Sequence, residues 1–149
     1  MTYPPIERFE PVETVQPWGT ETLIAEGPGY TGKLLFYKAG HAGGFQYHVE
    51  KDETFYLHLG RAHVYSVWRD GESVDRVFME AGDSYHIPPG APHKFEAITD
   101  CVVFEASTPH RNDRVNVAEE LTGIPDPAGT LPSTWVRSAD GTHRRVTDE

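Results

Sequence analysis

The sequence predicts an all-β domain with the form of a sandwich or barrel, and three observations carry this prediction. The chain has 149 residues, a length that fits one domain with a full hydrophobic core. Its 14 glycines and 12 prolines, with a hydrophobic content of 38%, are typical of a β protein rich in turns. Short apolar-rich runs alternate with turn signals from Glu21 to about Ser107, at the even spacing expected of such folds.

Nine apolar-rich runs are expected to form the strands of this barrel. In chain order they read TETLIAE, GKLLFYKA, FQYHVE, ETFYLHLG, AHVYSVW, DRVFME, DSYHIP, HKFEAI and CVVFEAS. Turn-forming sequences separate them, among them GPG, KAGHAGG, AGD and PPGAP. The dipeptide Asp70-Gly71 is typical of a tight hairpin turn, so the runs VYSVW and VDRVF on either side of it should pair.

Both ends of the chain are expected to form irregular arms around a single domain that covers residues 1–149. We place the core barrel at about 18–108. Residues 1–17 contain four prolines, which favour an extended arm over a helix. Residues 109–149 are expected to form a C-terminal arm, in which the sequence NVAEEL at 116–121 can make one or two helical turns.

Composition limits the class of partner and the compartment. The net charge is −10 and the isoelectric point is about 5.2, which argues against nucleic-acid binding because that requires clustered Lys and Arg. Cys101 is the single cysteine, so no intrachain disulfide is expected. The N-terminal residues do not resemble a signal peptide, and no apolar stretch is long enough to cross a bilayer. We therefore expect a cytoplasmic protein with no membrane partner.

Four residues on or next to the expected strands have the chemistry of metal ligands. Gln46 and His48 are two apart on one strand, so their side chains point to the same face. Glu53 begins the next strand after a tight connection and can fold back onto that face. His93 follows the turn sequence PPGAP. One amide oxygen, two imidazoles and one carboxylate form a plausible set of ligands for a divalent first-row metal.

Two stretches of the chain resemble the two sequence motifs of the cupin superfamily. Residues 40–60 match the spacing of the first motif, with Gln46 in place of its first histidine. Residues 82–97 match the second motif, with Ala97 in place of its last residue, an asparagine. The resemblance implies a small double-stranded β-helix, or jelly-roll barrel, that binds one metal ion. The ligands that it implies are Gln46, His48, Glu53 and His93.

The ligand types indicate what such a metal ion would do. An amide in place of an imidazole keeps the ligand neutral but supplies a harder, oxygen donor, which suits Mn²⁺, Fe²⁺, Co²⁺, Ni²⁺ or Zn²⁺ better than a soft copper ion. A single carboxylate leaves the centre with a net positive charge, so it would act as a Lewis acid. Such a centre would polarise a carbonyl and stabilise an enediolate, as aldose–ketose isomerisation requires.

A longer stretch is similar to the cupin domain of phosphomannose-isomerase-type proteins. The similarity lies in Pro17-Trp18-Gly19 and in the pair Gln46 and His48, followed by an acid-rich turn and Glu53. It implies an enzyme that acts on a sugar or a sugar-like polyhydroxy compound. We therefore expect a metal-dependent isomerase or epimerase, with a sugar or sugar phosphate as its small-molecule partner.

Other side chains are candidates for catalysis and substrate binding. Glu105 lies on the run CVVFEAS, where alternation with Cys101 and Val103 can face it inward as a general base; an outward, solvated carboxylate is the alternative. Glu53 is a second candidate for catalysis. Candidate substrate contacts, each of which has an ordinary surface role as its alternative, are Lys33, Arg61 and His110.

Two other functions fit the same residues. His48, Glu53 and His93 are two histidines and one carboxylate, the ligand set of non-haem Fe²⁺ dioxygenases. A non-enzymatic cupin that binds a small ligand such as a sugar is the third possibility, because the sequence leaves the catalytic base open. The proline-rich N-terminal arm and the tail around Trp135 indicate contacts with a second subunit, so we expect a homodimer.

Overall fold

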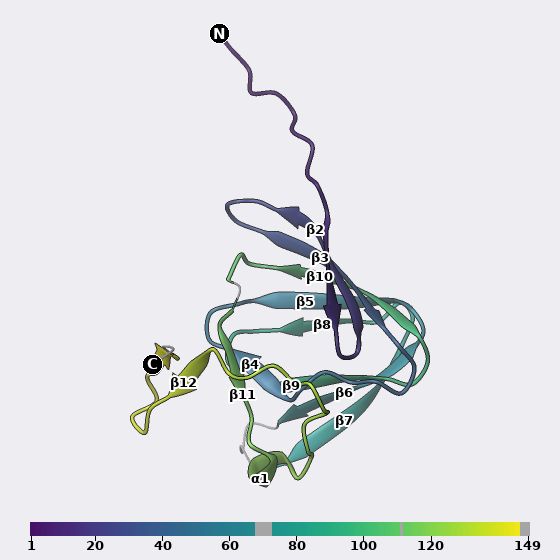
Figure 1. Cartoon of the computed structure of the whole chain (residues 1–149), viewed down its shortest axis with the longest axis vertical. Helices are drawn as coiled ribbons and strands as arrows, with labels where there is room; N and C mark the ends of the chain where they lie inside the picture. The colour runs from purple at the N-terminus through teal and green to yellow at the C-terminus, as the bar shows by residue number, and fades with distance from the viewer. Residues whose placement is uncertain (68–72, 111, 147–149) are drawn as a thin grey trace.

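The computed structural model describes residues 1–67, 73–110 and 112–146, and nearly all of its regular structure is β (Figure 1). The strands form two antiparallel sheets that lie over one another as the two layers of a jelly-roll barrel. One sheet has six strands in the order β1-β2-β3-β10-β5-β8, and the other has five in the order β11-β4-β9-β6-β7. The all-β barrel that the sequence predicts is confirmed.

Each of the nine predicted runs overlaps one strand of the barrel. Those in the six-stranded sheet are β2 (Gly19–Glu26), β3 (Thr31–Tyr37), β5 (Glu53–Leu59), β8 (Ser84–Ile87) and β10 (Cys101–Ser107). Those in the five-stranded sheet are β4 (Gln46–His48), β6 (Arg61–Val67), β7 (Val74–Glu80) and β9 (His93–Ala97). The predicted turn at Asp70-Gly71 lies outside the described residues, although β6 and β7 on either side of it do pair.

The N-terminal segment is extended and supplies the edge strand β1 (Val12–Gln16). This strand pairs with β2, and Pro11 and Pro17 flank it on both sides. Proline has no backbone N–H to donate to a neighbouring strand, which explains why the pairing is confined to five residues. Residues 1–11 leave the sheet and extend away from the barrel (Figure 1).

The C-terminal segment returns across the barrel. Strand β11 (Arg114–Asn116) joins β4 at the edge of the five-stranded sheet. The short helix α1 (Glu119–Thr122) begins three residues later than the expected 116–121 and ends one residue later. Asn116, the first of the expected positions, is instead the last residue of β11. Beyond it, β12 (Trp135–Arg137) and β13 (His143–Arg145) form a separate hairpin.

The hydrophobic core lies between the two sheets. Its most completely buried large side chains are Phe45, Leu57, Met79 and Val103. Several core residues, including Leu35 and Phe55, also line a cavity, so the packed interior supports the walls of the candidate site. Within the described part of the chain, the helical structure is neither long nor apolar enough to span a membrane.

Candidate metal centre and cavity

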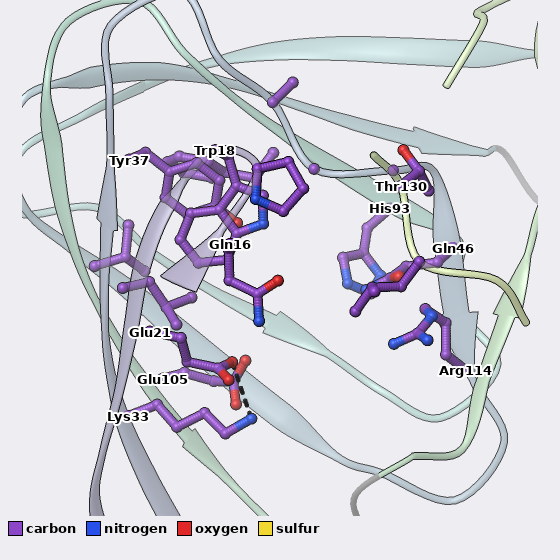
Figure 2. Close-up of a pocket in the computed structure, with 18 of the residues that line it drawn as sticks. Gln16, Trp18, Glu21, Lys33, Tyr37, Gln46, His93, Glu105, Arg114 and Thr130 are labelled. Atoms are coloured by element: carbon purple, nitrogen blue, oxygen red, sulfur yellow. Dashed lines mark hydrogen bonds and ion pairs between the residues drawn. The ribbon is translucent and has the colours of Figure 1, made fainter. Parts of the chain in front are cut away.

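A cavity of about 420 Å³ opens between the sheets, and most residues singled out from the sequence line it (Figure 2). Strands of both sheets contribute to its wall, and residues 127–131 of the C-terminal segment close part of one side. A hydrogen bond holds this segment in place: the backbone N–H of Phe45 donates to the carboxylate of Asp126 at 3.2 Å. The C-terminal arm is therefore part of the site.

Three buried side chains meet in this cavity. Nε2 of His93 lies 3.1 Å from Oε1 of Glu53, and Nε2 of His48 lies 3.8 Å from the same oxygen. The three candidate ligand atoms all lie within 4.8 Å of one another. His48 ends β4, Glu53 begins β5 and His93 begins β9, so three strand ends bring them together.

The turn before His93 is tied directly to β4. Pro88 and Pro89 lead into Gly90, whose φ of +83° is in the left-handed region that glycine adopts at low cost. The backbone N–H of Gly90 donates to the carbonyl of His48 at 2.8 Å. This hydrogen bond sets the start of β9 against the end of β4, and thereby His93 against His48.

Hydrogen bonds to the other ring nitrogens orient both imidazoles. Nδ1 of His93 lies 3.0 Å from the carbonyl oxygen of Ala91, and Nδ1 of His48 lies 2.9 Å from Oδ1 of Asp113. A carbonyl or carboxylate oxygen accepts, so each Nδ1 carries the hydrogen. In a neutral ring Nε2 then has a free lone pair, and both Nε2 atoms face Glu53.

The pKa directions agree with this arrangement. Burial would raise the pKa of the Asp113 carboxyl, but hydrogen bonds from His48 and from the backbone of Glu50 and Lys51 outweigh it and lower the pKa to about 2. Burial lowers the pKa of His48, which favours its neutral form. Two imidazole nitrogens and a carboxylate oxygen are acceptors that converge on one point, and this set fits a divalent cation.

Gln46 stands on the same strand as His48 and lines the same cavity. Its backbone partner across the sheet is His93, and Figure 2 shows the two side chains next to one another. The structure thus gathers Gln46 with the three residues of the cluster in one wall of the cavity. Its amide has no hydrogen-bond partner among the described residues, so its oxygen is available to a ligand.

Sequence reasoning missed a buried lysine between the two carboxylates. Nζ of Lys51 lies 3.0 Å from Oε2 of Glu53 and 3.3 Å from Oε2 of Glu105. Burial alone would lower the pKa of Lys51, but the charges of Glu105 and Glu53 raise it, so the ammonium stays charged. Lys51 lies in the turn before β5, where strand alternation does not predict the direction of a side chain.

The pKa values of the two carboxyl groups are shifted in opposite directions. Burial would raise the pKa of Glu53, but its close neighbours His93 and Lys51 lower it overall. Burial raises the pKa of Glu105, and the neighbouring Glu53 carboxylate adds to this, although Lys51 opposes it. Glu105 faces the cavity, so the inward orientation weighed against an outward one is the orientation observed.

The three candidate substrate contacts are not brought together. Lys33 lines the cavity, and His110 lies at its edge with 44% of its side chain exposed. Arg61 is exposed and does not line the cavity. It follows the far end of β5, while Glu53 begins that strand, so about 20 Å of extended chain separates them.

Aromatic rings line the side of the cavity formed by the six-stranded sheet. The rings of Trp18 and Tyr37 stack with centroids 3.9 Å apart and an interplanar angle of 13°. The ring of Tyr37 also contacts the ring of Phe95, with centroids 4.5 Å apart. Trp18 belongs to the Pro-Trp-Gly element seen in the sequence, and the structure shows that this element supplies a wall of the cavity.

The site is thus a buried cluster of two histidines and a glutamate inside a jelly-roll barrel. The family model described as "Cupin domain" matches residues 34–101, which run from β3 to the first residue of β10. The fold and this match together support placing the chain in the cupin superfamily. A comparison with curated proteins finds no match to the sequence.

Solved structures of several other proteins share the fold. The capsular polysaccharide assembling protein CapF from Staphylococcus aureus superposes with a TM-score of 0.64 at 18% identity, over 74% of this chain and 35% of CapF. KdgF from Halomonas sp. gives 0.59 at 20% identity, over 70% of this chain and 90% of KdgF. Oxalate decarboxylase from Bacillus subtilis gives 0.62 at 18% identity, over 78% of this chain and 32% of that enzyme.

These structural relatives show the fold alone at such identities. The chain spans about a third of the length of CapF and of oxalate decarboxylase. The metal, the substrate and the reaction of this chain therefore have to be argued from its own residues.

Proposed function

We propose that the protein is a metal-dependent enzyme that isomerises or epimerises a sugar or a sugar-like polyhydroxy substrate. One observation carries the proposal: a cluster that fits a metal ion shares a cavity with a second buried carboxyl group, Glu105, and Lys51 joins the two. A proton can thus be moved at a substrate carbon next to the place where a metal ion would hold the substrate oxygens.

The residues that would hold the metal are Gln46, His48, Glu53 and His93. Oxygen and imidazole ligands with a single carboxylate suit Mn²⁺, Fe²⁺, Co²⁺, Ni²⁺ or Zn²⁺. When bound, such an ion supplies a Lewis acid that polarises a substrate carbonyl or hydroxyl.

Glu105 is our candidate for the group that transfers the proton. Its carboxyl group is buried and its pKa is raised, which brings it closer to the neutral range in which a base can also act as an acid. The ammonium of Lys51 stabilises the ionised form before the proton is taken up. Glu53 has a lowered pKa and contacts both histidines, so we assign it to the metal instead.

The walls of the cavity support a polyhydroxy substrate. Trp18 supplies an apolar ring surface of the kind that packs against the C–H groups of a sugar, and Glu21 and Lys33 supply hydrogen-bonding groups. The sequence similarity to phosphomannose-isomerase-type domains and the structural similarity to a capsular polysaccharide assembling protein point in the same direction. They support a sugar as the substrate class without identifying the sugar.

Exchange of substrate hydrogens with solvent tests the proposal. Metal-loaded protein is incubated in deuterium oxide with a panel of aldoses, ketoses and their phosphates, and proton NMR follows the loss of signal at the carbons next to the carbonyl. Exchange is expected with at least one compound. In Glu105→Gln it is expected to fall by at least about a hundredfold, the lower end of the 10²–10⁴ that a general base contributes. Failure to exchange across the whole panel would contradict the proposal.

A dioxygenase is the second candidate, because the described residues place two histidines and one carboxylate together. Consumption of dioxygen by the Fe²⁺-loaded protein in the presence of an organic substrate would favour it. A ligand-binding protein without activity would bind a compound of the panel with no exchange, and Glu105→Gln would not change that binding.

We also propose that the protein is a homodimer. Residues 1–11 extend away from the barrel, and their apolar side chains, including Tyr3 and Ile6, are fully or largely exposed (Figure 1). A two-fold dimer in which the arms contact the partner would cover this apolar surface. Sedimentation analysis is expected to give twice the chain mass, and deletion of residues 1–11 is expected to weaken the dimer. A monomer at micromolar concentration would exclude it.

A further inference from the structure

Three neighbouring strands place a polar cluster in the wall of the cavity opposite the metal-binding residues. Gln16 of β1, Glu21 of β2 and Lys33 of β3 all line the cavity, and Figure 2 shows them across from His93 and Gln46. These three residues, here called the polyol subsite, have no part in the metal cluster.

The charges of the polyol subsite cancel within it. Nζ of Lys33 lies 3.1 Å from Oε1 of Glu21, and the two side chains are only 12% and 25% exposed. Gln16 is neutral, and its amide has no hydrogen-bond partner among the described residues. The subsite thus offers donors and acceptors but no net positive charge.

The charged groups nearest to the polyol subsite, Glu105 and Lys51, do not favour an anion there. Glu105 shares this wall and lies close enough to Lys33 for their charges to interact. The ammonium of Lys51 is engaged by two carboxylates. Arg114 lies on the metal side of the cavity, where its guanidinium donates to the carbonyl of Pro132. A phosphate dianion in the polyol subsite would face two carboxylates and an already paired ammonium.

The same groups match the hydroxyls of an uncharged substrate. A hydroxyl group can donate to the carboxylate of Glu21 and accept from the ammonium of Lys33, while the amide of Gln16 does both. The ring of Trp18 next to them gives an apolar surface for the C–H groups between those hydroxyls.

We propose that the polyol subsite binds the hydroxyl groups of an uncharged, non-phosphorylated polyhydroxy substrate and discriminates against phosphate esters. The inference rests on the proposed function for the reaction, but the binding that it describes can be measured without turnover. It narrows the substrate from a sugar or sugar phosphate to a neutral sugar or polyol, with Lys33 as part of a neutral pair and not as a phosphate anchor.

Calorimetric titration of the wild-type protein tests the inference. The probes are matched pairs, each a neutral sugar or a sugar alcohol and its terminal phosphate ester, measured on metal-loaded and on chelator-treated protein. A metal ion would itself attract phosphate, so the chelator-treated sample measures the preference of the subsite without that contribution. The neutral member of at least one pair is expected to bind about tenfold more tightly than its phosphate, a difference of about 1.4 kcal/mol, because the carboxylates repel the phosphate.

Glu21→Gln provides the decisive variant, because it leaves the ammonium of Lys33 without its carboxylate. The preference for the neutral compound is expected to shrink by about tenfold or to reverse, since the freed ammonium attracts phosphate. Glu10→Gln is the matched control: it removes the same charge from an exposed ion pair on the N-terminal arm and is expected to leave the preference unchanged.

The results that overturn the inference differ from those that overturn the proposed function. Tighter binding of phosphate esters by the wild type, an unchanged preference in Glu21→Gln, or no binding of any neutral compound would each overturn the polyol subsite. Binding of neutral compounds without solvent exchange would uphold the subsite and count against the isomerase. Solvent exchange with phosphate esters alone would uphold the isomerase and overturn the polyol subsite.

Discussion

Nδ1 of His48 lies 2.9 Å from Oδ1 of Asp113, a residue 65 positions later in the chain. The second oxygen of the same carboxylate accepts hydrogen bonds from the backbone N–H groups of Glu50 and Lys51, at 2.7 and 2.8 Å. One buried carboxylate therefore orients an imidazole of the metal cluster and holds the turn that leads to Glu53. This links the C-terminal segment to the ligand geometry.

Asp113→Asn is expected to weaken metal binding. The amide can no longer hold the His48 ring with a charged acceptor, and loss of such a supporting contact typically costs about 10–100-fold in metal affinity. The measurement is competitive titration with a metal-binding dye. Asp52→Asn is the control, because Asp52 also pairs with a histidine, His86, but on the exposed surface. An affinity equal to that of the wild type would contradict the role of Asp113.

Gln46→Ala is expected to lower the affinity for Co²⁺ or Zn²⁺ by about tenfold, and Gln46→His is expected to retain it, since an imidazole is also a good ligand. Gln16→Ala removes the same group from the opposite wall and is expected to have no effect on metal affinity. If Gln46→Ala binds metal as well as the wild type, the amide is not a ligand, and the argument from oxygen donors to Lewis-acid chemistry fails.

Lys51→Met is expected to destabilise the metal-free protein by about 3–5 kcal/mol, because it leaves the buried carboxylates of Glu53 and Glu105 without their cation. Urea unfolding measures the change. Adding Glu105→Gln to this variant removes one unpaired charge and is expected to restore part of the loss. Lys38→Met, at an exposed position, is expected to change the free energy by less than about 0.5 kcal/mol. A similarly small change for Lys51→Met would show that the buried ion pairs do not support the fold.

The stability of the fold is expected to depend on acid pH through Asp113. Its pKa falls from an ordinary value of 3.8 to about 2, so the ionised carboxylate stabilises the folded state above about pH 4, and this contribution is lost as the pH falls toward 2. The difference in unfolding free energy between wild type and Asp113→Asn, both treated with chelator, is expected to narrow by about 2 kcal/mol over that range. A difference in unfolding free energy that does not change with pH would contradict the lowered pKa of Asp113.

Apolar-rich runs bounded by turn signals were sufficient to predict the strands. Several of these strands bury one face and expose more of the other, as β5 does, whereas β9 is buried on both faces. The spacing of Gln46, His48 and Glu53 also predicted that they would lie in one wall, since it depends on a single strand and the turn after it. The strand β1 was not predicted, because two flanking prolines made its five residues look like part of an arm.

Contacts between distant segments could not be read from local patterns. Asp113 reaches His48 only because β11 pairs with β4, and no spacing in the sequence reveals that pairing. Arg61 was a candidate substrate contact, but it follows β5 at the end of that strand remote from Glu53. For Arg61, the residue type indicated a possible contact with substrate, but the direction of β5 places the residue away from the cavity.

Metal analysis of the purified protein tests the central claim most directly. After loading with Mn²⁺, Fe²⁺, Co²⁺, Ni²⁺ or Zn²⁺ and removal of excess ion, we expect about one equivalent of metal per chain for at least one of them, as a single set of ligands implies. His93→Ala, with one of the two histidines removed, is expected to lose most of that metal while remaining folded. A wild-type protein that retains none of the five ions, or a variant that retains as much as the wild type, would contradict the metal centre.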